Sequence, residues 1–352
     1  MAAALRLSKS VLDREGPQGL GLWRQSLDQV DIGWQGLLVL AKEARLAPLD
    51  MGWCALSLEP QDPRIGLETV PEGPAGPVVI IELDGRCPAV PQGAAVLRMR
   101  GWVEAQVVAG GAIDGATLGL LRLYAPYALG SVLARRRGRA MSVSHFAQSL
   151  DGRIATFTGD SRWIGNEDNL IHAHRMRALC DGILIGAQTL RRDKPRLNVR
   201  RVPGDDPARI VLGARGDELA DLLQVSSARL LLVCSPKAPN DDARIEHLQV
   251  AASGAGPVKP AAILKALYDS GIHSVYVEGG SHTTSGFLTD NALDVVQLHH
   301  APLILGGGVG SFGFEGVEEV RSSVRFDAHF YEPVGDGVMF VGAPSSFGEE
   351  NA

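Results

Sequence analysis

The second half of the chain alternates short apolar runs with segments of helical periodicity. Runs rich in Val, Ile and Leu predict six strands, at 142–147, 182–185, 209–212, 230–234, 274–277 and 295–298. Helical patterns lie between them at about 166–179, 260–270 and 281–289. Because strands that alternate with helices form βαβ units, this pattern predicts an α/β fold with a mostly parallel sheet flanked by helices.

The first half has a different pattern. Strand-like runs at 78–83, 95–99 and 103–108 surround a Pro- and Gly-rich stretch, and residues 117–136 predict an amphipathic helix broken at Pro126. At 352 residues the chain exceeds one comfortable core. We therefore expect a smaller α+β domain over 1–140, an α/β domain over 141–342 and a flexible tail over 343–352. Within the second domain, segments 325–331 and 337–341 predict an antiparallel hairpin with a long turn.

Composition and charge exclude several classes of protein. The net charge of −6 gives no basic field for nucleic acid. The basic run 135–139 is interpreted as a solvated junction or a local anion contact. Cysteines form no C-x-x-C pair and histidines lack ligand spacing, so neither a metal site nor a disulfide framework is predicted. No signal peptide and no membrane-spanning run is read, which predicts a cytoplasmic protein.

Two glycine-rich junctions could carry ligand chemistry. Residues 275–281 run from a strand into a helix across Gly279 and Gly280, where helix-start N–H groups and close backbone approach suit a phosphate. Glu278 precedes them at the carboxyl end of an apolar strand, where open α/β sheets place ligands. A plain turn and a capping or solvated glutamate remain open as alternatives. The loop 303–310 lacks a P-loop's Gly-Lys-Ser/Thr, so it either walls a cofactor or turns the chain.

Several polar positions between 149 and 200 have two interpretations each. Trp163, beside Ser161, either packs in the core or stacks on a bound ring. Arg177 lies on a cationic helix face that is either solvated or directed at a phosphorylated substrate. Thr189 and Asp193, one helical turn apart, either direct a hydroxyl and helix-start amides at an anion or form a cap beside a solvated carboxylate.

The order of these motifs resembles that of a known family. Ser-Leu-Asp-Gly-Arg-Ile-Ala at 149–155 is followed by Gly-Asp-Ser-Arg-Trp-Ile, by Gly-Ala-Gln-Thr-Leu-Arg-Arg-Asp-Lys-Pro-Arg-Leu-Asn-Val-Arg at 186–200, by Val-Glu-Gly-Gly and by Ala-Pro-Leu-Ile-Leu-Gly. Over about 141–342 the chain is similar to the reductase domain of bifunctional riboflavin-biosynthesis proteins. The resemblance implies a dihydrofolate-reductase-like fold, a homodimer, NADPH as cofactor, and hydride transfer that reduces the ribosyl group of a pyrimidine ribosylamine 5′-phosphate to ribityl.

The resemblance also implies roles for individual residues. It implies NADPH contacts at Ala147, Trp163, Thr189, Asp193 and the stretch from Gly280 and Ser281 to Gly286. It implies substrate contacts at Ser161, Arg177, Leu197, Arg200 and Glu278. Guanidinium groups suit a phosphate monoester. Glu278 is the expected catalytic residue, which stabilises an iminium-like carbon or handles a proton near the opened ribose.

Three departures from the family pattern leave the substrate open. His145 stands where a lysine often precedes the Ser-Leu-Asp-Gly motif, and Gly213-Ala214 replaces a common Asp-Ser. Residues 1–140 lack the H-x-E and P-C-x-x-C of the partner deaminase, so the reductase half looks attached to something else. A reductase of another pterin- or pyrimidine-like compound, or a non-catalytic nucleotide-binding protein, remains an alternative. The joint presence of Trp163, Thr189, Asp193 and Glu278 favours an enzyme.

Overall fold

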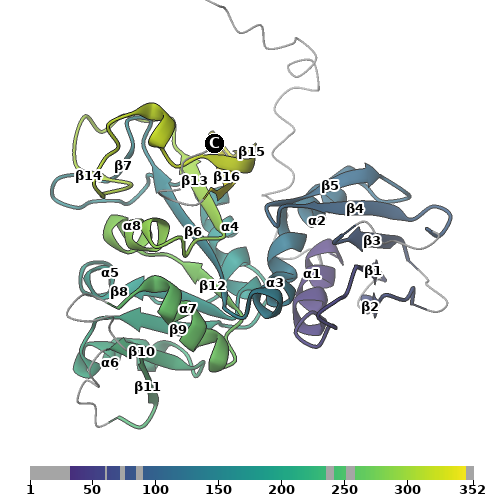
Figure 1. Ribbon diagram of the computed structural model, residues 1–352, viewed down its shortest axis with the longest axis horizontal. Coiled ribbons are helices and arrows are strands. Elements are labelled where there is room, and N and C mark those ends of the chain that lie inside the picture. The colour runs from purple at the N-terminus through teal and green to yellow at the C-terminus, as the bar shows by residue number, and fades with distance from the viewer. Residues whose placement is uncertain are drawn as a thin grey trace, which may run out of the picture.

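The computed structural model describes residues 32–59, 62–71, 76–84, 90–234, 242–250 and 258–345. These residues form two main sheets that lie beside one another (Figure 1). The start of the chain, for which no signal peptide is predicted, and residues 346–352 of the predicted tail lie outside this description. Across the described part, no helix combines the length and apolar character that crossing a bilayer requires.

The first sheet has five strands in the order β2-β1-β3-β4-β5. Its strands are β1 (Trp53–Ser57), β2 (Arg64–Leu67), β3 (Val78–Glu82), β4 (Ala95–Arg100) and β5 (Glu104–Ala109). Helices α1 (Ile32–Glu43), α2 (Gly115–Ala128) and α3 (Gly130–Arg137) accompany it. The predicted break is present but misplaced, because α2 continues through Pro126 to Ala128 and the break falls at Leu129, before α3. Buried neighbours around Pro126 offset the hydrogen bond that its ring removes near the helix end.

The second sheet has nine strands in the order β11-β10-β9-β8-β12-β6-β13-β16-β15. They are β6 (Met141–Gln148), β8 (Gly182–Gly186), β9 (Ala208–Leu212), β10 (Leu230–Cys234), β11 (Ile245–Gln249), β12 (Ser274–Val277), β13 (Val295–His300), β15 (Phe326–Val334) and β16 (Gly337–Pro344). All neighbours from β11 to β13 are parallel, and β16 and β15 are antiparallel. The predicted, mostly parallel sheet is therefore confirmed.

Helices and shorter elements complete this half of the chain. They are β7 (Arg153–Ala155), α4 (Glu167–Leu179), α5 (Ala187–Asp193), η3 (Gly216–Leu219), α6 (Ala220–Val225), α7 (Pro260–Asp269), α8 (Ser281–Thr289), β14 (Val309–Gly310) and η4 (Val320–Ser322). The predicted long hairpin turn is wrong. Pro333 and Val334 still pair with β16, which leaves only Gly335 and Asp336 in the turn. β15 lies at the sheet edge, where a proline is tolerated, and β16 extends into the segment expected as tail.

One hydrophobic core joins the two halves. Leu120, Tyr124 and Tyr127 of α2 belong to the same buried cluster as Met176 of α4 and Met339 of β16. α7 and α8 pack on the opposite face of the nine-stranded sheet in a second cluster. The N-terminal sheet therefore completes the core on the α4 side of the larger sheet.

The basic run lies at the junction, where Arg136 and Arg137 are exposed and Arg137 and Arg139 contact a carboxylate. Arg135 and Arg136 donate to backbone carbonyls in the segment after α1, whose oxygens have no helical partner. Arg137 and Arg139 both pair with the buried carboxylate of Asp294. The arginines thus connect the two halves.

A buried polar chain crosses the junction beside this core. The Tyr124 hydroxyl donates to Nδ1 of His172 on α4 over 2.8 Å, and Nε2 of His172 donates to Oε1 of Gln297 on β13 over 2.9 Å. Burial lowers the pKa of His172 to about 4, so the imidazole is neutral. The guanidinium of Arg175 lies 5.6 Å from the ring centre of Trp34 and 5.5 Å from that of Tyr124.

We expect Tyr124→Phe to lower the free energy of unfolding by about 1–3 kcal/mol, because Nδ1 of His172 would be buried without a donor. Tyr127→Phe is the matched control. The Tyr127 hydroxyl is equally buried but has no hydrogen-bond partner of normal geometry, so its removal should change little or stabilise slightly. Urea denaturation at pH 7.5 compares the two variants. Equal losses would contradict the importance of the Tyr124–His172 bond.

Candidate active site

The starts of α5 and α8 lie side by side at the carboxyl ends of β8 and β12. A Cβ built on Gly280 would lie 3.7 Å from Oγ1 of Thr189, and one on Gly186 would lie 2.7 Å from Oγ1 of Thr283. The structure therefore brings together Thr189, Gly280 and Ser281, three of the predicted cofactor residues. The carboxyl edge of a parallel sheet is the usual place for a ligand.

Both helices begin without a side-chain cap. Neither Gly186 nor Gly280 caps its helix with a side chain, so the first-turn amides receive no side-chain acceptor from the cap residue. Such amides, with the helix dipole behind them, favour an anion. A side chain on Gly279 would bring its Cβ within 2.5 Å of the Cβ of Thr283, so the tight junction at α8 requires a glycine.

Trp163 is not a core residue. Its side chain is 83% exposed and its φ is +69°, an unusual conformation for a bulky residue. Ser161 is exposed on the same loop. Of the two interpretations from the sequence, core packing is therefore wrong, and the indole is free to stack on a ligand.

The Trp163 loop, residues 156–166, connects β7 to α4 and lies against α5 and β6. At one end Gly159 lies against the guanidinium of Arg192 on α5, and a Cβ there would collide with it. At the other end a Cβ on Gly165 would lie 3.3 Å from the Cβ of Ala147. The loop thus borders the same sheet edge and adds Ala147 to the set of neighbouring predicted residues.

Arg177 and Glu278 bind each other. Nε and Nη2 of Arg177 donate to the two carboxylate oxygens over 2.8 and 2.7 Å, and Nη1 donates to the carbonyl of Asn198 over 3.1 Å. The side chains are only 11% and 18% exposed. Burial alone would lower the pKa of Arg177, but the adjacent carboxylate of Glu278 raises it. Glu278 is therefore neither a cap nor a solvated carboxylate, and Arg177 fixes its orientation.

Positive charge gathers beside this pair on residues 196–206, here called the arginine loop. Arg200 is exposed, and burial together with Arg177, Arg201 and Arg196 lowers its pKa. Mutual repulsion of this kind favours an anionic ligand. Arg196 carries no predicted role, although it stands inside the quoted motif.

Leu197 is the buried apolar residue among the predicted substrate contacts. Its side chain is fully buried in the core, so only its backbone could contact a substrate. Its φ of +53° is uncommon for a leucine, and Trp163 and Lys194 share this left-handed conformation nearby. Backbone strain of this kind clusters at functional sites.

Two predicted cofactor residues lie away from the helix starts. Asp193 is the last residue of α5, opposite the end that begins beside Gly186. Gly286 lies in the middle of α8, about 9 Å along the axis from Gly280. At the Gly213-Ala214 departure, Gly213 has φ +67° and Ala214 is buried, so this loop offers no side-chain hydroxyl or carboxylate at either position.

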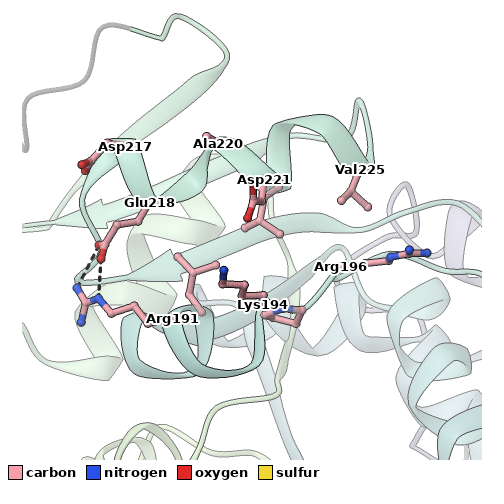
Figure 2. Close-up of a pocket in the computed structure, with 11 residues that line it drawn as sticks. Arg191, Lys194, Arg196, Asp217, Glu218, Ala220, Asp221 and Val225 are labelled. Carbon is pink, nitrogen blue, oxygen red and sulfur yellow. Dashed lines mark hydrogen bonds and ion pairs between the residues drawn. The ribbon is translucent and has the colours of Figure 1, made fainter.

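A separate pocket of about 340 Å³ lies between α5 and the η3–α6 segment (Figure 2). Charged residues line it, and Arg191 donates to Glu218 over 2.6 Å, as the dashed lines show. None of the predicted site residues lines this pocket. We therefore place the candidate site at the helix starts and the Arg177–Glu278 pair.

Comparison with known proteins assigns the family. The model of the RibD C-terminal domain matches residues 142–340. The chain belongs to this family. The 2,5-diamino-6-ribosylamino-4(3H)-pyrimidinone 5′-phosphate reductase of Methanothermobacter thermautotrophicus is 33% identical over 197 residues, which cover 54% of this chain and 91% of that protein. Riboflavin biosynthesis protein RibD of Mycobacterium tuberculosis is 31% identical over 198 residues, 55% of this chain and 51% of that protein. The match thus spans about half of RibD.

Solved RibD structures share the fold over more of the chain. The deaminase/reductase of Thermotoga maritima has a TM-score of 0.56 at 21% identity, covering 89% of this chain and 99% of that one. Acinetobacter baumannii RibD gives 0.58 at 18% identity, covering 91% and 100%. Coverage this large extends beyond 142–340 into the N-terminal sheet. The fold likeness to these RibD chains therefore includes part of the N-terminal half, which forms the expected smaller α+β domain.

Four buried histidines predict acid sensitivity. His145, His172, His174 and His299 are each at most 6% exposed. Burial lowers the pKa of His145 well below its ordinary value, and lowers those of His172 and His299 to about 4 and of His174 to about 3. When folding depresses the pKa of a histidine, the folded state keeps its full stability at pH values above the unfolded pKa of about 6.5. Below that pH the unfolded state binds the proton more readily, so the free energy of unfolding falls.

We expect the free energy of unfolding to fall between pH 6.5 and 5, by up to about 1.4 kcal/mol per pH unit for each buried histidine. His174→Asn removes one of these titrating groups, so the slope should fall by up to about 1.4 kcal/mol per pH unit. The asparagine amide oxygen can still accept from the backbone N–H of Arg200, as Nδ1 does now, so the fold should be kept. Urea denaturation at several pH values measures both slopes. A flat wild-type profile over this range would refute the prediction.

Proposed function

We propose that this chain is an NADPH-dependent reductase of riboflavin biosynthesis that converts the ribosyl group of a pyrimidine ribosylamine 5′-phosphate to ribityl. The names of its relatives support this reaction, because the M. thermautotrophicus protein and one from Aquifex aeolicus are both 2,5-diamino-6-ribosylamino-4(3H)-pyrimidinone 5′-phosphate reductases. The observation that carries the proposal is the buried Arg177–Glu278 pair beside two uncapped helix starts.

The residues present fit NADPH. The first turns of α5 and α8 offer backbone N–H groups to a pyrophosphate, with the Thr189 hydroxyl between them. The exposed indole of Trp163 is available to a flat ring. When bound, the cofactor supplies the hydride. The Gly213-Ala214 loop contributes no side-chain hydroxyl, so the proposed phosphate contacts lie at the two helix starts.

The chain's own residues serve the substrate in two ways. Reduction breaks the bond between C1′ and the ring oxygen, adds hydride to C1′ and adds a proton to that oxygen. Positive charge develops at C1′ as the ring opens, and the carboxylate of Glu278, held by Arg177, stabilises it. The arginine loop provides guanidinium groups for the 5′-phosphate.

A direct assay tests this function. NADPH oxidation is followed with the pyrimidine ribosylamine 5′-phosphate, with its deaminated uracil counterpart and with dihydrofolate, and products are identified by mass. Turnover of either pyrimidine phosphate supports the proposal. Turnover of dihydrofolate alone points to another pterin-like substrate, and NADPH binding without any turnover points to a nucleotide-binding protein. Absence of binding at millimolar NADPH, read by Trp163 fluorescence, refutes the proposal.

We also propose that the protein is a cytoplasmic homodimer whose partner molecule is the phosphorylated pyrimidine. The homodimer follows from membership in the reductase family. Sedimentation velocity tests it, and a monomer at micromolar concentration contradicts it.

We expect Arg177→Ala and Arg200→Ala to differ in their kinetic effects. Loss of Arg177 releases Glu278, so kcat should fall by about 10- to 100-fold, the equivalent of one charged hydrogen-bonded contact. Loss of Arg200 removes a phosphate contact, so KM should rise by about tenfold with a smaller change in kcat. Arg244→Ala, which removes an exposed arginine that pairs with Asp242, is the control. If Arg177→Ala raises KM alone, its assigned role is wrong.

A further inference from the structure

Two nearly opposite faces of helix α4 contact different parts of the protein, the N-terminal half and the proposed substrate site. His172 and Arg175 lie three residues apart on one face, and His174 and Arg177 lie three residues apart on nearly the opposite face. The first face meets Tyr124 and Trp34 of the N-terminal half. The second binds Glu278 and, through Nδ1 of His174, the backbone N–H of Arg200. Any shift of the helix at the first face therefore moves the second.

Trp34 contacts both α4 and the arginine loop, the two elements that carry the proposed substrate residues Arg177 and Arg200. Its ring lies over the guanidinium of Arg175 on α4, and its indole N–H donates to the carbonyl of Pro203 in the arginine loop over 2.8 Å. Trp34 is only 3% exposed and Arg175 only 4%. A cation between aromatic rings in a desolvated setting is held strongly in position. One side chain of α1 thus fixes α4 and the arginine loop relative to each other.

Other contacts of α1 reinforce this arrangement. Lys42 pairs with Asp205 of the arginine loop over 3.4 Å, and a Cβ built on Gly204 would lie 3.6 Å from Leu38. Arg45, just beyond the helix, pairs with Asp181, which follows α4 closely in the chain. None of these contacts involves α5 or α8, where the proposed cofactor segments begin, and α8 packs on the opposite face of the sheet.

We propose that the N-terminal half is a positioning element for the substrate side of the reductase site, and that Trp34 is its principal positioning residue. This inference rests on the proposed function. Trp34 acts through Arg175 on the Arg177–Glu278 pair and through Pro203 on the arginine loop. It leaves the cofactor segments untouched. Substrate binding therefore depends on the N-terminal half, whereas cofactor binding does not.

The experiment compares Trp34 with a second tryptophan of the same half. Trp53 on β1 is also buried, at 6% exposed, but it belongs to a separate apolar cluster on the other face of the five-stranded sheet. Trp34→Phe, Trp34→Leu, Trp53→Phe and Trp53→Leu are made in the full chain. For each, KM and kcat with the pyrimidine phosphate, the Kd of NADPH and the urea midpoint are measured.

Trp34→Phe keeps a ring for Arg175 and loses the bond to Pro203, so KM should rise by about fivefold to tenfold, as for one lost hydrogen bond. Trp34→Leu loses both contacts, and kcat/KM should fall by about 30-fold or more. The Kd of NADPH should stay within about twofold in both variants. The Trp53 variants should leave KM and kcat unchanged, even where they lower the urea midpoint.

The remaining outcomes decide against the inference. If Trp53 and Trp34 variants lose kcat/KM equally, or if the Kd of NADPH rises in parallel, Trp34 acts only on general stability. If Trp34→Leu does not fold, Arg175→Met replaces it, with Arg175→Lys expected to restore most of the lost kcat/KM by returning the cation. Wild-type protein that neither binds nor reduces the pyrimidine phosphate overturns the proposed function itself, whereas wild-type turnover with unaffected Trp34 variants overturns only this inference.

Discussion

The buried pair of Arg177 and Glu278 is the interaction on which the site depends. Two opposite charges removed from water are favourable only when their geometry is good and their remaining donors are satisfied. Here the bidentate contact and the Asn198 carbonyl meet that condition. The pair joins α4 to the end of β12, so the packing of both elements must hold it. The core on this face of the sheet therefore serves the chemistry as well as the stability.

Neutral histidines allow a polar helix to be buried on two faces. A charged side chain would need a counter-ion at each contact, whereas a neutral imidazole offers one donor and one acceptor. His172 uses both, toward Gln297 and Tyr124, and His174 accepts from the backbone of the arginine loop. The ring centres of His145 and His172 lie 5.0 Å apart, and burial keeps the pKa of His145 well below its ordinary value, so this residue adds no charge where the family often has a lysine. Because these buried histidines are neutral in the folded state, the protein is expected to lose stability in acid.

Much of the larger sheet could be predicted because parallel strands buried on both faces are continuous apolar runs, and glycines and Pro260 mark the helix ends. The contact between Arg177 and Glu278 could not, since 101 residues separate them and no local pattern encodes their meeting. The exposure of Trp163 and the positive φ of Leu197 depend on the loop's surroundings. Pro126 within α2 shows the same limit, because tertiary packing overrides a local helix breaker.

The N-terminal half combines a fold likeness to RibD with the absence of the deaminase zinc motif. The fold likeness to longer RibD chains extends into it, but residues 1–140 lack the H-x-E and P-C-x-x-C by which deaminases hold zinc. Removing α1 and α2 would expose Met176, Met339 and the charge of Arg175. The burial of that surface gives a physical reason for the chain to retain this half, independent of any reaction carried out there.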